Sequence, residues 1–521
     1  MNVLKNPSFF RPASRPTSPA PVLPASQLDG DRSTHPLNKL SLSNFRRSTA
    51  THPVITSTLT APLIQDGSYL ETLALKLSEA VSKALSQPTG PANASEQVLG
   101  KRPIPQGRGQ ALGSLIATEL KSTQDNLHLY RAIIRSLHRP LSVLLTNLSA
   151  HLMPLLSTPA FNSAPTIQAP GLNASQLHAI ALAGFSEELL VVFDEFDLGT
   201  ENDVRGEGLR SIREGLVSVI NRVVNPLVGA IRNDLIPLME ALEKPNTSPA
   251  KATTGTKGTI VLHPSIVTLQ TLMPLYERVL RRCTTCTVTH TTLATLLISV
   301  LWKGLVALSH RPDIAASPPS SPDVSPVVSA LRRLGSPTTT PSITPPPGRF
   351  TMKLPPSRPP SPPSAVVPAS AAADCRALCE LVSLLPRPSA DKPSTKLAGE
   401  AVSEAFEGLK HLGGLLEALQ TKSKLPPAAI DLATLTAELP TLIALPVILR
   451  AFLPKMQGVP EILGLSDEEY RKGCLSGFSR AEECAGVVAQ RVLYVLRKNY
   501  DPNETPTKWL EVEVGEDSTD L

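Results

Sequence analysis

The segment Asp66–Pro88, DGSYLETLALKLSEAVSKALSQP, decides the fold class. Its apolar residues recur at spacings of three and four, which places them on one face of a helix; they are Leu70, Leu73, Leu77, Val81 and Ala84. Ser68 followed by Glu71 has the spacing of a capping box, and Pro88 predicts where the helix stops. The segment therefore predicts an amphipathic helix that packs its leucine face against other helices.

Similar apolar stripes recur along the chain, and only the short Trp509–Val514 run, WLEVEV, alternates with the period of a strand. The stripes cover residues 109–122, 125–138, 140–157, 173–197, 207–243, 264–309, 371–384, 397–420, 427–456 and 467–499. Their spacing shows no fixed repeat period. The pattern predicts an all-α protein, an irregular multi-helix bundle, with an α-solenoid-like stack as the alternative.

Proline punctuates several of these stripes, as in NPLVGAI from Asn225 to Ile231. Proline is tolerated at the first helical position, and Asn225 before Pro226 fits an N-cap followed by that position. Inside a helix, proline costs about 3 kcal/mol and bends the axis. The long stripes are therefore expected to be broken or kinked helices.

Proline also marks the domain boundaries, because the chain has 521 residues and 52 prolines. Residues 1–65 form a Pro/Ser-rich stretch without periodicity, and residues 311–370 contain 17 prolines. These compositions predict a disordered basic tail and a disordered, semi-rigid linker. A helical domain at 66–310 and a second helical block at 371–500, which could pack on the first, surround the linker. An acidic tail at 501–521 ends the chain.

Positive charge is concentrated in the two proline-rich stretches. Residues 1–60 carry a net charge of +5 and residues 311–370 a net charge of +4, whereas the whole chain carries only +5. Such segments could bind anionic lipid or an acidic protein, or could simply be solvated. The remainder of the chain has no net positive charge and few aromatic residues, which argues against nucleic-acid binding.

The sequence predicts a cytoplasmic protein. The N-terminus lacks the apolar run of a signal peptide, and its prolines oppose the amphipathic helix of a mitochondrial presequence. The best candidate membrane span, Leu293–Leu308, is short and contains Lys303. The six cysteines are therefore expected to be reduced.

The stretch RRCTTCTVTH, from Arg281 to His290, is the part of the chain that most resembles a metal or redox site. It contains a C-x-x-C pair, Cys283 and Cys286, with His290 four residues later. A structural zinc site needs four ligands, and the sequence has no second C-x-x-C pair; a redox centre would need a βαβ context. These three residues also continue an apolar helical seam: Leu272, Tyr276, Val279, Cys283, Cys286, His290, Leu293, Leu297 and Val300. We favour a core seam with a break near 284–289, while a partial metal site and a redox site stay open.

Other candidate chemistry is weaker. The basic segment GKRPIPQGRGQALG (residues 100–113) lacks the spacing of a phosphate-binding loop, although Lys101, Arg102 and Arg108 could touch a phosphate. The acidic stretch 194–203 does not follow calcium-loop spacing. Because no hydrolase or metalloprotease signature is present, we expect no enzyme activity, cofactor or metal.

The proline-rich linker carries the most specific interaction signals. Lys353, Pro356 and Pro359 match the ligand pattern of SH3 domains. The candidates for proline-directed kinases are eight serines and threonines that precede proline, one in the N-terminal tail and seven in the linker: Ser18, Ser317, Ser321, Ser325, Ser336, Thr340, Thr344 and Ser361. Each phosphate adds about −1.5 to −2 charges, so three would reverse the sign of the linker.

These features favour a non-enzymatic helical scaffold or adaptor that is regulated by phosphorylation of its disordered segments. The expected partners are proteins, including SH3-domain proteins and proline-directed kinases. The alternative is a peripheral membrane or tethering factor that places its basic tail on anionic lipid.

Overall fold

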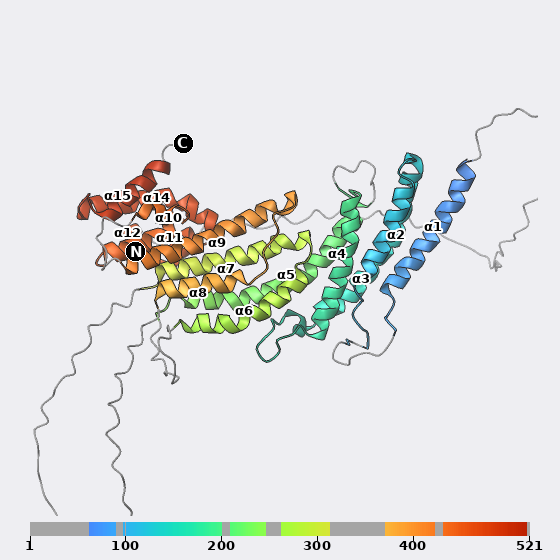
Figure 1. Ribbon diagram of the computed structural model, residues 1–521, viewed down its shortest axis with the longest axis horizontal. Coiled ribbons are helices and arrows are strands. Elements are labelled where there is room, and N and C mark those ends of the chain that lie inside the picture. Colours follow the sequence, from blue (N-terminus) through green and yellow to red (C-terminus); the bar gives the residue numbers. More distant parts are fainter. Residues whose placement is uncertain are drawn as a thin grey trace, which may run out of the picture. The chain divides into compact units, whose positions relative to one another are not determined.

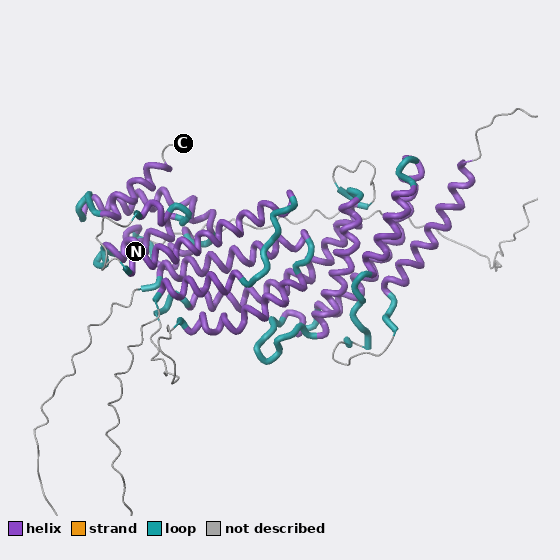
Figure 2. Tube along the Cα trace, in the orientation of Figure 1, coloured by secondary structure: helices purple, strands orange, loops and turns teal. Residues whose placement is uncertain are grey.

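The computed structural model describes residues 62–89, 97–98, 100–200, 209–245, 262–312, 370–421 and 431–517. The all-α prediction is confirmed for these residues, which form fifteen α-helices and no strand (Figure 2). A single isolated bridge joins Val98 and Lys101. The expected N-terminal tail up to residue 61 and nearly all of the expected linker lie outside the described residues.

The helices follow the predicted stripes closely. In chain order they are α1 (Pro62–Leu85), α2 (Arg108–Ser122), α3 (Leu127–Leu156), α4 (Ala174–Glu195), α5 (Arg210–Ala241), α6 (Pro264–Cys283), α7 (Thr287–His310), α8 (Ala371–Ser383), α9 (Pro393–Gln420), α10 (Leu432–Thr436), α11 (Thr441–Phe452), α12 (Val459–Leu463), α13 (Asp467–Cys474), α14 (Phe478–Asn499) and α15 (Thr505–Asp517). A short 3₁₀ turn, η2 (Pro159–Asn162), follows α3.

Helix α1 has the predicted apolar face but a different start. Leu73, Leu77, Val81 and Ala84 are buried, and Leu70 packs against the core at their edge. The capping box at Ser68 was wrong, because α1 begins six residues earlier, at Pro62. The Ser68 carbonyl instead accepts a hydrogen bond from the Thr72 hydroxyl at 2.9 Å, inside the helix.

The prolines of α3 and α5 do not split these helices, which corrects the separate stripes expected at 125–138 and 140–157. Helix α3 continues through Pro140 and Pro154, and α5 continues through Pro226. The Asn225 side chain therefore caps no helix and accepts a hydrogen bond from the Thr292 hydroxyl of α7 at 2.8 Å. Burial of the leucine face on both sides of each proline outweighs the proline penalty of about 3 kcal/mol.

The helices pack side by side along the body (Figure 1), and their contacts form two series. Helices α1, α3, α5, α7 and α9 contact one another in that order, and α2, α4, α6 and α8 form the second series. Helix α11 packs against α7 and α9, and α14 and α15 pack against α11. Helices from both sides of the expected linker are thus in direct contact, because α9 lies on α7 and α8 lies on α6.

The strand-like run WLEVEV forms part of helix α15. Trp509 and Leu510 are buried, and the Trp509 indole donates a hydrogen bond to the Thr436 hydroxyl at 3.0 Å. Residues 505–517 of the expected acidic tail therefore pack on the body through their apolar side chains.

Two helices, α4 and α7, are long and apolar enough to cross a membrane by length and composition. This differs from the sequence prediction, in which the best candidate span was the shorter run Leu293–Leu308 within α7. In the most apolar windows of α4 and α7, 61% and 67% of the residues are buried within the body. Helices in the core of a globular protein pass the same test, so packing accounts for the apolar character of both.

Helices α2 and α4 approach each other closely through two glycines spaced by four residues. A Cβ atom at Gly113 would lie 2.6 Å from Cγ2 of Val192, and one at Gly109 would overlap the Phe185 carbonyl oxygen. The Glu188 side chain lies over the same spot, 2.8 Å from that Cβ position. Only glycine permits this contact between the two backbones.

We expect Gly109→Ala to lower the free energy of unfolding by about 2–3 kcal/mol, because the added methyl forces α2 away from α4. Gly184→Ala is the matched control, since no atom lies within 4 Å of its Cβ position on α4. The control should be neutral or stabilising by about 0.5–1 kcal/mol. Chemical denaturation measures both changes, and equal stabilities of the two variants would contradict the close approach.

Candidate functional site

The C-x-x-C segment lies at a break between two helices. Helix α6 ends at Cys283 and α7 begins at Thr287, so the seam is not one continuous helix. The expected break falls at residues 284–286. Residues of the seam are nevertheless buried on both sides of this break: Tyr276, Val279, Cys283, Leu293, Leu297 and Val300.

Glu187 of α4 holds the break in place. Its carboxylate accepts hydrogen bonds from the Thr285 hydroxyl and the Cys286 thiol. Burial raises the pKa of Cys283 to about 12, and burial together with Glu187 raises that of Cys286 to about 11. Protonated thiols are poor nucleophiles and poor metal ligands, so this environment favours the core interpretation over the redox and metal alternatives.

The basic, glycine-rich segment before α2 connects helix ends instead of forming an anion site. The Arg108 guanidinium donates to carbonyls at the end of α1, including that of Ala84 at 3.0 Å. The Glu188 carboxylate accepts hydrogen bonds from the backbone N–H groups of Gly107 at 2.8 Å and Gly109 at 2.9 Å. The chain's own carboxylate thus fills the position that a phosphate would take at this helix N-terminus.

Two carboxylates at the C-terminal end of α4 form ion pairs with neighbouring helices. Asp194 pairs with Arg213 of α5, and Glu195 pairs with Lys121 of α2 at 2.8 Å. These cations offset the repulsion between carboxylates and the negative end of the α4 dipole. Residues 201–208 lie outside the described part of the chain.

The predicted linker sites cannot be placed on the fold. The SH3-type ligand residues Lys353, Pro356 and Pro359 lie outside the described residues. The same holds for every phosphorylation candidate: Ser18, Ser317, Ser321, Ser325, Ser336, Thr340, Thr344 and Ser361.

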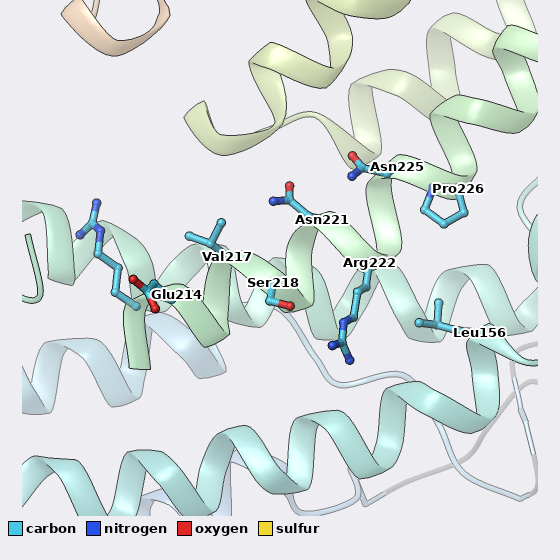
Figure 3. Close-up of a pocket in the computed structure, with 9 residues that line it drawn as sticks. Leu156, Glu214, Val217, Ser218, Asn221, Arg222, Asn225 and Pro226 are labelled. Carbon is cyan, nitrogen blue, oxygen red and sulfur yellow. The ribbon is translucent and has the colours of Figure 1, made fainter. Parts of the chain in front are cut away.

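A broad groove of about 670 Å³ runs along α5 (Figure 3). Ser218, Asn221 and Arg222 line it from α5, and Leu156 reaches it from the end of α3. The lining has one carboxylate, Glu214, and neither histidine nor cysteine. Its amide and hydroxyl groups suit hydrogen bonding with a partner surface more than acid–base chemistry.

Helix α3 carries a row of unneutralised positive charge. Arg131, Arg135 and Arg139 are exposed and follow one another at four-residue spacing along one side of the helix. Helix α3 contains no aspartate or glutamate. Among the described residues, these arginines form no ion pair or hydrogen bond. We call this row the arginine face.

Exposed apolar side chains flank the arginine face at the same spacing. Leu127 precedes the row and is 46% exposed, and Val143 follows it and is 51% exposed. Each four-residue step turns about 40° around the helix axis, so the row is oblique and Leu127 and Val143 lie on opposite flanks of it. The guanidinium groups can bind several carboxylates or phosphates along this row. The opposite side of α3, with Ile134, Leu141 and similar residues, is buried in the body.

The net charge of whole segments does not reveal this face, because acidic residues elsewhere in the same segment offset the three arginines. The signal that could have found it is local: three arginines at four-residue spacing in a 30-residue helix without acids.

Comparison with known proteins adds no family: no family model, curated protein or solved structure matches the chain.

Proposed function

We propose that this protein is a non-enzymatic helical scaffold or adaptor that docks acidic protein segments on the arginine face of α3. The supporting observation is the row of Arg131, Arg135 and Arg139, exposed and without an ion-pair partner among the described residues. Exposed arginines on a helical surface usually have carboxylates at neighbouring positions, as Arg210 has Glu214 in α5. A partner helix with acids at four-residue spacing would supply the missing charges and cover the flanking apolar residues.

The proline-rich linker supplies regulation in this proposal. Its Ser-Pro and Thr-Pro sites, Ser317 to Ser361, would receive phosphates from proline-directed kinases, and Lys353, Pro356 and Pro359 would bind an SH3 domain. A phosphorylated linker carries the charge that the arginine face binds, so it would compete with acidic partners for that surface.

Reversal of the arginine face tests the proposal. We expect the triple variant Arg131→Glu, Arg135→Glu, Arg139→Glu to bind an amphipathic helical peptide with glutamates at four-residue spacing at least roughly tenfold more weakly than the native protein. Fluorescence anisotropy of the labelled peptide measures the affinity, and binding by the native protein should weaken as salt is raised.

A second triple variant, Arg376→Glu, Lys396→Glu, Lys410→Glu, is the control. It makes the same change in net charge on α8 and α9, where all three cations are exposed and ion-paired. Loss of those pairs costs little stability. If both triple variants bind the peptide equally, binding follows net charge and the arginine face has no special role.

The alternative function, a peripheral membrane tether, is supported by the exposed Leu127 and Val143 beside the arginines, since basic surfaces with apolar flanks also bind anionic bilayers. Flotation with phosphatidylserine vesicles distinguishes the two functions. Vesicle binding that is lost in the arginine-face variant, combined with no peptide binding, would replace the adaptor proposal with the tether.

A further inference from the structure

A cavity of about 270 Å³ lies where the end of α7 meets α11, the loop after it and the start of α13. Its apolar wall comes from Leu449, Leu453, Met456 and Val459. The other wall is polar and includes His310, the last residue of α7. The site is far from α3 in sequence and shares no residue with the arginine face or with the groove along α5.

His310 lines this cavity and carries a buried hydrogen-bond acceptor. Its Nδ1 atom lies 3.0 Å from the Val306 carbonyl oxygen and 3.0 Å from the Ser309 hydroxyl oxygen. Because the Ser309 hydroxyl donates its own proton to the Val306 carbonyl, Nδ1 carries a proton and donates it to these oxygens. The Nε2 atom is then an acceptor, and it is buried with no hydrogen-bond partner among the described residues. A buried acceptor without a donor costs about 1–3 kcal/mol, which a ligand that donates a hydrogen bond would recover.

The charges around the cavity balance. Arg471 donates to both Glu243 carboxylate oxygens at 2.7 and 2.5 Å and to Asp467 at 2.6 Å. Arg450 donates to the Ser309 carbonyl and contributes a second positive charge. Two carboxylates thus face two guanidinium groups, and neither an anion nor a cation would gain from entering.

We propose that this cavity binds an uncharged small molecule with an apolar body and one hydroxyl group that donates a hydrogen bond to His310 Nε2. The apolar wall receives the body, and the polar wall fixes its orientation through this single bond, the usual composition of a small-molecule pocket. The burial that lowers the pKa of His310 keeps the imidazole neutral at physiological pH, so that Nε2 stays an acceptor.

Three probes of similar shape test the site by isothermal titration calorimetry on the full chain: 4-pentylphenol, 4-pentylanisole and 4-pentylbenzoate. The phenol has the donor, the anisole has its oxygen without a proton, and the benzoate is an anion. We expect the phenol to bind roughly tenfold or more tightly than either of the others, since only the phenol satisfies His310. No binding of the phenol, or equal or tighter binding of the anisole or benzoate, would overturn the proposal.

Two variants assign the binding to this cavity. His310→Phe should reduce the preference for the phenol over the anisole to less than about threefold. Met456→Trp should fill the cavity and abolish binding of the phenol and the anisole. His138→Phe, a substitution at an exposed position of α3, should keep the native preference for the phenol. A cooperative thermal transition confirms that each variant is folded. A phenol preference that persists in folded His310→Phe would contradict the assigned hydrogen bond, and binding that survives in Met456→Trp would contradict the assigned cavity.

Discussion

Replacing Asp374 by alanine is expected to lower the free energy of unfolding by about 3–5 kcal/mol, because the substitution leaves the Arg311 guanidinium buried without its counter-charge. The Asp374 side chain is fully buried, and that of Arg311 is 4% exposed. One Asp374 oxygen accepts from Arg311 at 2.5 Å, and the other accepts from the His263 backbone N–H at 2.9 Å. Both are contacts of α8 with residues on the other side of the expected linker: His263 precedes it, and Arg311 is its first residue.

The same carboxylate joins four helix ends. Asp374 lies in the first turn of α8, Arg311 follows α7, and His263 is the N-cap of α6. His263 Nε2 lies 3.1 Å from the carbonyl oxygen of Lys244, just beyond α5. Loss of Asp374 should therefore loosen the attachment of α8 to α6 and α7, and not merely expose one side chain.

Denaturant unfolding of three variants separates the buried charge from other effects. Glu417→Ala, which removes an exposed pair with Arg376, should cost no more than about 1 kcal/mol. Replacement of the buried pair by Asp374→Leu with Arg311→Met should recover most of the stability lost in Asp374→Ala. A loss below about 1 kcal/mol in Asp374→Ala would show that the pair does not hold the four ends together.

His310 is expected to make the fold sensitive to mild acid, with a loss of about 2.5 kcal/mol at pH 4.5. Burial, aided by the nearby positive charges of Arg471 and Arg450, lowers the pKa of His310 to about 4, while Glu243 acts in the opposite direction. Above about pH 6.5, histidine is neutral in the folded and unfolded states and contributes no pH dependence. Between about pH 6.5 and 4, the unfolded chain takes up the proton first, so the folded state loses stability as the pH falls.

The free energy of unfolding of the native protein and of His310→Phe, measured at about pH 7.5 and 4.5, tests this expectation. The native protein should lose about 2.5 kcal/mol more than the variant between the two conditions. Other groups with shifted pKa values, such as His263 and Glu187, act in both proteins and cancel in the difference. Parallel losses in native protein and His310→Phe would mean that His310 is not held neutral by the fold.

The sequence predicted the helices well, because leucines at three- and four-residue spacing leave little choice of buried face. The burial of Leu73, Leu77 and Val81 on α1 followed directly from their spacing. The helix boundaries were harder to predict, because they depend on tertiary packing. Helix α1 begins before its apparent capping box, and α5 continues through Pro226.

The buried and half-buried ion pairs could not be predicted from the sequence, because they join residues that are distant along the chain. Asp374 and Arg311 are separated by 63 positions, and Arg471 and Glu243 by 228. Nothing local distinguishes Asp374 from an exposed aspartate in the first turn of a helix. The close approach at Gly109 likewise depends on Phe185 and Glu188 of another helix.

Crosslinking from the arginine face tests the functional proposal most directly. A photoreactive phenylalanine at position 135 of the full chain, activated in cells, should form a protein adduct whose crosslinked peptide is rich in aspartate and glutamate. Reversal of Arg131 and Arg139 to glutamate should abolish this adduct, and the same probe at the exposed position 400 on α9 should not form it. Adducts from position 135 that match those from position 400, or that survive the reversal, would contradict a docking role for α3.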